Sequence, residues 1–411
     1  MTDDARYIAL GILMDILEDG KFSHIALREG LKNHPDLPER DCALVTRLTE
    51  GTTEFCIQLD YILNAYSKIK VKKMKPLIRN ILRMSAYQIL YLDRIPDSAA
   101  INEAVKLAKK RGLAGLAGYV NAVLRSISRE RGEILADLMD PAKTPLSVRY
   151  SLPEWLYNYI VLCYGKEEAA RIAEWYLSGD NETFVRTEDG RTEKMSGNIA
   201  ASEAFRKGEI TVQDYASQQV GLLSAPEAGD FVLDVCAAPG GKACHIASLL
   251  KGSGMVEARD LSEEKTDLIR ENISRLHLKN IRTRVWDARV TDPSLLDRNG
   301  RGKADILIAD LPCSGLGIIG KKPDIRFSAS LEGIRELQTL QREILKTVTA
   351  YVRPGGRMLY STCTLTREEN EQNTAWIQEK FGFKLLKEKK FLPGQPSDGF
   401  YIAEFSAPEA E

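Results

Sequence analysis

The chain has 411 residues, of which 44% are hydrophobic and 28% charged, and its net charge is −1 at neutral pH. This composition is typical of a globular protein, and the length predicts two or three domains. No segment approaches the roughly 20 uninterrupted apolar residues that cross a bilayer, so we expect no membrane association. The acidic N-terminus lacks the basic start and apolar block of a signal peptide, and a cytoplasmic location is therefore expected.

Residues 1–130 show helical patterning almost throughout. Apolar residues recur at helical spacing within 7–17, 43–48, 77–90 and 100–107, with breaks at Gly20, Pro35, Pro76 and Pro96. This pattern predicts an all-α bundle. Residues 131–215 are mixed in character, with a proline-rich linker near Pro141, and we expect a mixed α/β subdomain.

A basic run lies inside the helical region. No acidic residue occurs between Asp60 and Asp93. The same window carries seven cations, which are Lys68, Lys70, Lys72, Lys73, Lys75, Arg79 and Arg83. On a nearly neutral protein such a run indicates contact with a polyanion, while the alternative interpretation is a solvated helix face.

From residue 216 to 411 strands alternate with helices. Five β-rich segments lie at 231–237, 254–262, 281–288, 304–312 and 355–364, and helical segments at 242–250, 263–276 and 331–351 separate them. This alternation predicts an α/β domain with a parallel, doubly wound, Rossmann-like sheet. Ligands bind such sheets beyond the carboxyl ends of the strands, so the residues at those ends are the candidate site.

The turn after the first predicted strand is rich in glycine. It reads Cys236, Ala237, Ala238, Pro239, Gly240, Gly241 and Lys242. It is neither GxGxxG nor a P-loop. Asp260, at the end of the second strand, is placed to hold a ribose, and Asp287, after the third, to bind an adenine amino group, although both could be helix caps. The set fits a nucleoside cofactor that is not held mainly by phosphates, such as S-adenosylmethionine.

The fourth and fifth predicted strands each end in a cysteine. Cys313 follows Asp310, and Cys363 lies in the segment Ser361-Thr362-Cys363-Thr364. An isolated cysteine is usually core filler, but two at adjacent strand ends predict reactive thiols. A thiolate that adds to carbon 6 of cytosine makes carbon 5 reactive toward a methyl donor, and a carboxyl at Asp310 can hydrogen-bond the base at N3 and N4.

The seven cysteines and four histidines indicate neither disulfides nor metal. The cysteines are odd in number and scattered, none forms a CxxC pair, and the histidines make no ligand cluster. We therefore expect free thiols and no bound metal.

Several motifs resemble the Sun/Nop2-type RNA 5-methylcytosine methyltransferases. The matching segments are DVCAAPGGK, DLPCSGLG, KKPDIRF, RPGGRMLYSTCT, RYSLPEWL, VQDYASQQV and DGFYIAEF, and together they span about residues 145–405. The resemblance implies that Cys363 is the nucleophile, that Cys313 helps to release the product, and that residues 236–242, Asp260, Asp287 and Asp310 contact S-adenosylmethionine. The resemblance also implies that the subdomain of residues 131–215 contacts RNA. The sequence departs from the family pattern in three places, at Ala243, at Leu311 and in the segment 184–188.

The N-terminal segments GKFSHIALREGL, ERDCALVTRLTEGT, LIRNILRMSAYQILYLDRIPDSAAINEAVKLAK and YVNAVLRSI resemble the NusB-type RNA-binding fold. A fused NusB-like module is characteristic of the bacterial branch that acts on small-subunit ribosomal RNA. The resemblance therefore implies a naked or partly assembled ribosomal RNA as partner, with no obligate protein partner, and makes the basic run a phosphate-contacting surface.

Alternative functions stay open at this point. Transfer RNA is the second candidate substrate. A non-catalytic NusB-like assembly factor is disfavoured because Asp310, Cys313 and Cys363 are all present. An amino-directed methyltransferase would need an Asn/Asp-Pro-Pro-aromatic segment where this chain has Asp-Leu-Pro-Cys, and a dehydrogenase would need GxGxxG.

Overall fold

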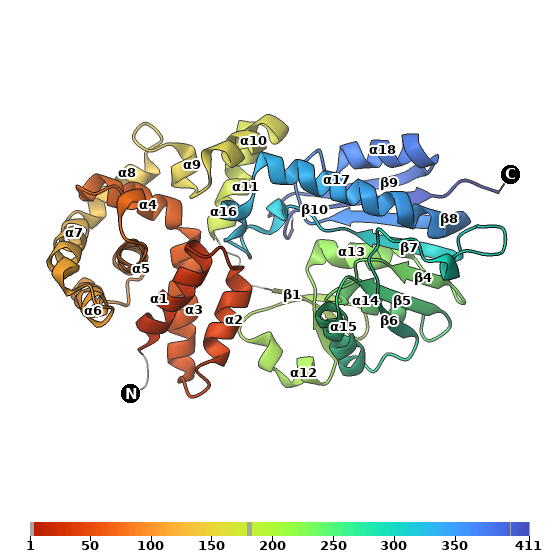
Figure 1. Ribbon diagram of the computed structural model, residues 1–411, viewed down its shortest axis with the longest axis horizontal. Helices are drawn as coiled ribbons and strands as arrows, with labels where there is room; N and C mark the ends of the chain where they lie inside the picture. Colours follow the sequence, from red (N-terminus) through yellow and green to blue (C-terminus); the bar gives the residue numbers. More distant parts are fainter. Residues whose placement is uncertain (1–3, 179–182, 395, 411) are drawn as a thin grey trace. The chain divides into compact units, whose positions relative to one another are not determined.

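The computed structural model describes residues 4–178, 183–394 and 396–410. They form two compact units, one made of Met1–Ser178 and Ile319–Ser328, the other of Gly179–Ile318 and Ala329–Glu411. In Figure 1 most helices of the first unit run from red to yellow, and the large sheet of the second is green to blue. None of the helices in the described ranges has both the length and the apolar character that spanning a bilayer demands. The proposed three-part division at residues 130 and 215 stays a prediction.

The first unit is entirely helical, which confirms the all-α prediction. Its helices are α1 (Ala5–Leu17), α2 (Ser23–Lys32), α3 (Glu39–Glu54), α4 (Cys56–Tyr66), η1 (Val71–Lys73), α5 (Pro76–Tyr91), α6 (Asp97–Lys110), η2 (Ala114–Leu116), α7 (Ala117–Arg129), α8 (Arg131–Met139), α9 (Leu146–Arg149), α10 (Glu154–Tyr164), α11 (Lys166–Ser178) and α16 (Ile325–Ser328). Proline begins α5 at Pro76, and Pro96 precedes α6, because a proline ring fits only the first turn of a helix. Every residue from Ile81 to Leu90 is buried, so α5 is the central helix of this unit.

Residues 319–328 return to the first unit from the middle of the second. The Arg326 side chain is 1% exposed, and its Nη1 donates to the Ser151 carbonyl oxygen at 3.0 Å and to the Glu54 carbonyl oxygen. Ser23 Oγ donates to the carboxylate of Asp324. The KKPDIRF segment is therefore built into the helical unit by buried hydrogen bonds.

The second unit contains two sheets. A small antiparallel sheet has the order β2-β1-β3, and a seven-stranded sheet has the order β6-β5-β4-β7-β8-β10-β9. The strands are β1 (Thr183–Thr187), β2 (Thr192–Met195), β3 (Ile210–Val212), β4 (Phe231–Asp234), β5 (Met255–Asp260), β6 (Ile281–Val285), β7 (Ala304–Asp310), β8 (Val352–Thr362), β9 (Lys384–Phe391) and β10 (Phe400–Ser406). The five strands from β6 to β8 in this order are parallel, as predicted. Two further strands, β10 and β9, were not predicted, and they extend the sheet with antiparallel pairing at one edge.

Helices cover both faces of the large sheet. They are α13 (Tyr215–Ser224), α14 (Gly241–Leu249), α15 (Glu263–Arg275), α17 (Leu331–Val348) and α18 (Glu371–Phe381), with η4 (Pro293–Leu295), η5 (Leu316–Ile318) and η6 (Thr349–Tyr351) in the connections. Two further short helices, η3 (Ile199–Ala201) and α12 (Glu203–Arg206), pack with the small sheet instead. Ile306 and Ile308 of β7 share a core with α13, α14 and α15, while Leu307 and Ala309 share another with α17 and α18. Alternate residues of one strand thus enter two cores, which defines a doubly wound α/β unit.

The sheet order reverses at β4, whose neighbours are β5 and β7. In an open α/β sheet the crevice beyond the carboxyl ends of the strands at this point is the usual place for a ligand. The glycine-rich turn follows β4, and Asp310 ends β7. The fold therefore brings the predicted motifs to one edge of one sheet.

Candidate active site

A cavity of about 440 Å³ lies at this edge of the sheet. Its lining residues are Val235, Cys236, Ala238, Asp260, Leu261, Lys265, Trp286, Asp287, Ala288, Arg289, Asp310, Leu311, Pro312, Cys313, Leu340, Ile344 and Cys363. Its volume is that of a typical small-molecule site, and its wall combines carboxylates with apolar side chains. All three predicted catalytic residues and the two predicted nucleoside-binding aspartates therefore share one cavity.

The turn between β4 and α14 is shaped by its glycine and by backbone hydrogen bonds. Gly240 has φ +101°, and a Cβ there would lie 3.1 Å from Ile269 Cγ2, so this position requires glycine. The Ala238 amide donates to Asp260 Oδ2 at 2.9 Å. The turn contributes Cys236 and Ala238 to the cavity wall. The other predicted cofactor-binding residues of the turn are outside the cavity lining of the described chain, namely Ala237, Pro239, Gly240, Gly241 and Lys242.

Two aspartates lie beyond β5 and β6. Asp260 is buried, and its Oδ1 accepts from the Leu261 amide at 2.8 Å and lies 3.0 Å from Lys265 Nζ. Asp287 is half-buried and ion-paired with Arg289, whose Nη2 lies 2.8 Å from its Oδ2. Hydrogen bonds from the Arg289 side chain and backbone hold the pKa of Asp287 below its usual range. The latter aspartate is therefore an ionised acceptor on the cavity wall.

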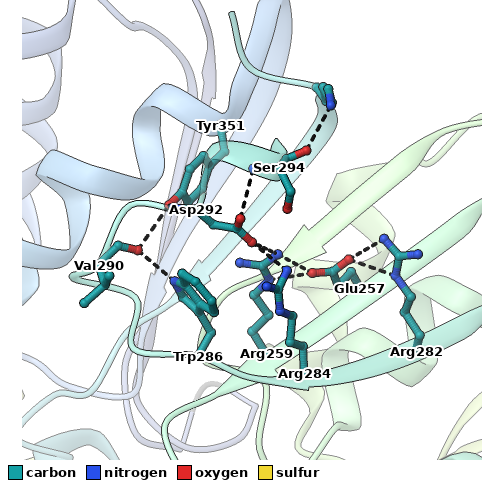
Figure 2. A network of polar contacts seen from close by, with 10 residues as sticks. Glu257, Arg259, Arg282, Arg284, Trp286, Val290, Asp292, Ser294 and Tyr351 are labelled. Carbon is teal, nitrogen blue, oxygen red and sulfur yellow. Dashed lines mark hydrogen bonds and ion pairs between the residues drawn. The ribbon is translucent and has the colours of Figure 1, made fainter. Parts of the chain in front are cut away.

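A buried ion-pair network supports the wall beside β6 (Figure 2). Arg259 is 2% exposed, and it donates from Nε to Glu257 Oε1 at 2.6 Å and from Nη2 to Asp292 Oδ2 at 2.8 Å. Its Cζ lies 5.5 Å from the ring centre of Trp286, which lines the cavity and donates Nε1–H to the Val290 carbonyl. A buried cation needs anionic partners, which Glu257 and Asp292 provide here. Arg259 in turn holds the Trp286 ring in the wall of the cavity.

Lys242 supplies positive charge next to the predicted catalytic carboxylate. Its Nζ lies 2.6 Å from Asp310 Oδ2, and Ser361 Oγ donates to Asp310 Oδ1 at 2.7 Å. Burial alone would lower the pKa of Lys242, but the charge and hydrogen bond of Asp310 outweigh it and the pKa is raised. The lysine therefore stays charged and ion-paired with Asp310 at neutral pH.

The structure shows a buried carboxyl that the sequence analysis did not single out, that of Asp234. It ends β4, is 1% exposed, and makes no well-formed hydrogen bond within the described chain. Burial, with a further contribution from the charge of Asp310, raises its pKa to about 8. The only sequence signal for it is an aspartate that closes an otherwise apolar strand. At neutral pH this group is largely protonated.

The two cysteines at the ends of β7 and β8 are in contact. The Sγ atoms of Cys313 and Cys363 lie 3.3 Å apart, and the Cys363 amide lies 3.3 Å from Cys313 Sγ. The hydrogen bond with Cys363, followed by burial, raises the pKa of Cys313 well above its ordinary value. Cys313 therefore keeps its proton and can donate a hydrogen bond to a thiolate at Cys363.

The lysines and the arginines of the basic run have different environments in the structure. Its five lysines, Lys68, Lys70, Lys72, Lys73 and Lys75, are exposed. Arg79 instead pairs with Glu18, and Arg83 is buried and donates from Nε to Asp60 Oδ1 at 2.7 Å. Carboxylates occupy both arginines, so it is the lysines of this run that offer positive charge to solvent. Contact with RNA by this surface stays a proposal.

Comparison with known proteins agrees with this organisation. A family model described as 16S rRNA methyltransferase RsmB/F matches residues 221–406, and the NusB family model matches residues 3–129. The probable ribosomal RNA small subunit methyltransferase B of Bacillus subtilis (strain 168) is 35% identical over 94% of this chain and 91% of its own length. The Shewanella oneidensis ribosomal RNA small subunit methyltransferase B is 29% identical over 97% and 98%. The crystal structure of PH0851 has a TM-score of 0.79 at 25% identity and covers 98% of this chain and 99% of that one.

The helical unit, the α/β sheet and the cavity at its switch point define an S-adenosylmethionine-dependent methyltransferase with a NusB-like N-terminal domain. The sequence-based predictions of the fold and the cofactor are thereby confirmed. The chain belongs to the family of ribosomal RNA small subunit methyltransferases B.

Proposed function

We propose that this enzyme methylates carbon 5 of a cytosine in small-subunit ribosomal RNA, with Cys363 as a covalent nucleophile. The observation that carries the proposal is the contact of two thiols, 3.3 Å apart, in the wall of the cavity that also contains Asp310. Methylation of an exocyclic amino group needs no thiol, whereas an unreactive ring carbon needs a nucleophile that can add and leave again.

The chemistry of the cavity wall fits S-adenosylmethionine. The ribose hydroxyls and amino groups of this cofactor are hydrogen-bond donors, and Asp260, Asp287 and Asp310 offer acceptors from three strand ends. Trp286 and Leu340 offer apolar surface for an adenine ring. The turn at 236–242 would approach the cofactor with its backbone. When bound, the cofactor would supply an electrophilic methyl group.

Cys363 adds to carbon 6 of the cytosine. The new bond joins Sγ to carbon 6, and the electron pair of the 5,6 double bond moves into the ring, which makes carbon 5 nucleophilic. The Asp310 carboxylate accepts a hydrogen bond from the N4 amino group of the base, and Lys242, whose Nζ lies 2.6 Å from Asp310, supplies the positive charge that opposes the negative charge developing at N3. Charge that develops on the ring is then stabilised by groups already in place.

Release of the product reverses the addition. Once carbon 5 carries the methyl group, a water molecule takes the remaining proton from carbon 5, and the electron pair of that C–H bond re-forms the 5,6 double bond. The bond between Sγ and carbon 6 breaks at the same time, and Cys363 leaves with its electron pair as a thiolate. Cys313, which retains its proton because its pKa is raised, donates a hydrogen bond to this leaving sulfur. The two cysteines thus have different tasks, Cys363 as the nucleophile and Cys313 as a hydrogen-bond donor.

The target base has to leave any stack to reach a sulfur inside a cavity, so the substrate is unpaired or locally opened RNA. The relatives in Bacillus subtilis and Shewanella oneidensis carry names that specify the small ribosomal subunit. The exposed lysines of the first unit, Lys68 to Lys75, are our candidates for phosphate contacts.

Methylation of purified RNA tests the proposal. Small-subunit ribosomal RNA and transfer RNA are incubated separately with enzyme and labelled cofactor, and modified positions are mapped by bisulfite sequencing. We expect 5-methylcytosine in ribosomal RNA, loss of activity in Cys363→Ala with cofactor affinity unchanged, and normal activity in the control Cys42→Ala. Label at another atom, modification of transfer RNA alone, or activity in Cys363→Ala would contradict it.

A further inference from the structure

Two adjacent residues in the loop between β8 and α18 each hold one of the cysteine-bearing loops. Glu369 and Asn370 are both fully buried. Glu369 bonds to the loop that contains Cys313, and Asn370 bonds to the segment that contains Cys363. Neither residue lines the cavity in the described chain, so their effect on the sulfurs is indirect.

The Glu369 carboxylate accepts four hydrogen bonds. Its Oε1 accepts from the Ser314 amide at 2.8 Å and from Gln341 Nε2 at 3.1 Å. Its Oε2 accepts from Ser314 Oγ at 2.5 Å and from Thr366 Oγ1 at 2.7 Å. Burial raises the pKa of Glu369, and these four donors oppose that rise. Four donors aimed at one side chain define an anionic acceptor whose position is fixed.

The residues on both sides of Cys313 are held through this carboxylate. Ser314 follows the cysteine and bonds Glu369 directly. Pro312 precedes it, and its carbonyl accepts from Gln341 Nε2 at 2.8 Å, the same nitrogen that donates to Glu369. The Cys313 backbone is thus fixed at two points.

Asn370 holds the residues that flank Cys363 in the same way. Thr362 Oγ1 donates to Asn370 Oδ1 at 2.5 Å, and Asn370 Nδ2 donates to the Thr364 carbonyl at 3.1 Å. The two loops also touch each other, because Thr364 Oγ1 and Ser314 Oγ lie 2.6 Å apart. Since Ser314 Oγ donates to Glu369, Thr364 is the donor in this contact.

We propose that Glu369 is a positioning residue that, together with Asn370, sets the distance between the Cys313 and Cys363 sulfurs. A buried carboxylate is costly unless every acceptor is used, so a residue needed only to fill space would not be charged. The effect of Glu369 on catalysis rests on the function proposed above, whereas its effect on the distance between the two sulfurs does not depend on that function.

The first test needs no RNA and no cofactor. Glu369→Gln keeps the shape of the side chain but removes its charge and replaces one acceptor oxygen by a donor, so that the two hydrogen bonds to that oxygen are lost or reversed and the Cys313 loop is held less firmly. Diamide oxidises two neighbouring thiols to a disulfide, and peptide mass spectrometry follows formation of the Cys313–Cys363 bridge. We expect bridge formation to slow about tenfold or more in this variant, since such reactions depend steeply on placement.

Ser314→Ala provides a second variant with a small change in volume. It removes one donor to Glu369 and the acceptor of Thr364, and we expect it to slow bridge formation as well. Glu368→Gln, the same substitution at the half-exposed neighbouring residue, is the matched control and should match the wild type. Rates within twofold of the wild type for both test variants would overturn the proposal.

The second test uses RNA and labelled cofactor. Glu369→Gln should bind S-adenosylhomocysteine like the wild type, yet accumulate a denaturant-resistant protein–RNA adduct, because the donor to the leaving sulfur is displaced. A parallel loss of cofactor affinity and activity without adduct would show a merely structural role and overturn the proposal. If the wild type itself forms no 5-methylcytosine, the proposed function fails, and the diamide rates still decide the role of Glu369.

Discussion

The sulfur atoms of Cys313 and Cys363 lie 3.3 Å apart although 50 residues separate them in the chain. The parallel pairing of β7 with β8 brings the two sulfur atoms together. Asp310 lies opposite Ser361 in this pair, and each strand is followed by its cysteine at the same edge of the sheet. The Leu311 amide donates to the Ser361 carbonyl at 3.2 Å and extends the pairing toward the two thiols. Two thiols from distant parts of the chain are thereby placed in direct contact.

Replacing Cys313 with alanine should separate adduct formation from adduct release. Cys363 can still add to the base, but its departure loses the neighbouring S–H donor. We expect Cys313→Ala to leave a protein–RNA band that survives denaturing electrophoresis. The double variant Cys313→Ala/Cys363→Ala should show no band, and a band that persists in it would place the covalent bond elsewhere.

Gly317 should not tolerate a side chain. Its amide donates to the Cys363 carbonyl at 3.0 Å, and an added Cβ would collide with the Gly399 carbonyl and lie 2.8 Å from the Cys363 carbonyl. Both are backbone atoms, so Gly317→Ala should cost roughly 1–3 kcal/mol of unfolding free energy and reduce turnover. Denaturant unfolding and initial rates measure the two effects. Gly333→Ala, which meets only the Ser330 side chain, is the control and should lose neither.

The stability of the enzyme should depend on pH through Asp234. Burial raises its pKa from an ordinary 3.8 to about 8, so folding favours the protonated form. The stabilisation is complete below about pH 4 and is lost as the pH rises to about 8, by at most about 1.4 kcal/mol per pH unit. Relative to Asp234→Asn, the wild type should therefore lose unfolding free energy across this range. If the denaturant midpoints of the wild type and of Asp234→Asn changed equally between pH 5 and 8, the pKa of Asp234 would not be raised.

The exposed lysines should contribute electrostatic affinity for RNA. The triple variant Lys72→Gln/Lys73→Gln/Lys75→Gln should bind RNA more weakly, and the slope of binding against salt should fall by about one for each phosphate that is no longer neutralised. Cofactor affinity should not change. Lys380→Gln, an exposed position on α18, is the control. An unchanged salt slope in the triple variant would remove this surface from the RNA interface.

The strand ends were predictable because local signals mark them. Alternation of apolar strands with helices placed Asp260, Asp310 and Cys363 at one sheet edge, and the structure brings the three into one cavity. The antiparallel edge was not predictable in this way, because β9 reads KLLKEKKF and lacks an apolar face.

Partners that are distant in the sequence leave no local signal. The donors to Glu369 come from the β7 loop, from α17 and from its own turn, so no single segment indicates their meeting. The basic run likewise suggested free arginines. Arg79 instead meets Glu18, the residue that follows α1 and lies about 60 residues earlier, which no window around the run could contain.

Residues 319–328 have a consequence for how the protein is made. Ile319 and residues 323–326 fill buried positions of the helical unit, where Arg326 bonds the backbone of Glu54 and Ser151. During translation the helices emerge first, yet their unit lacks these contacts until residue 328 has left the ribosome. The N-terminal unit is thus begun first but finished only after most of the catalytic sheet has been synthesised.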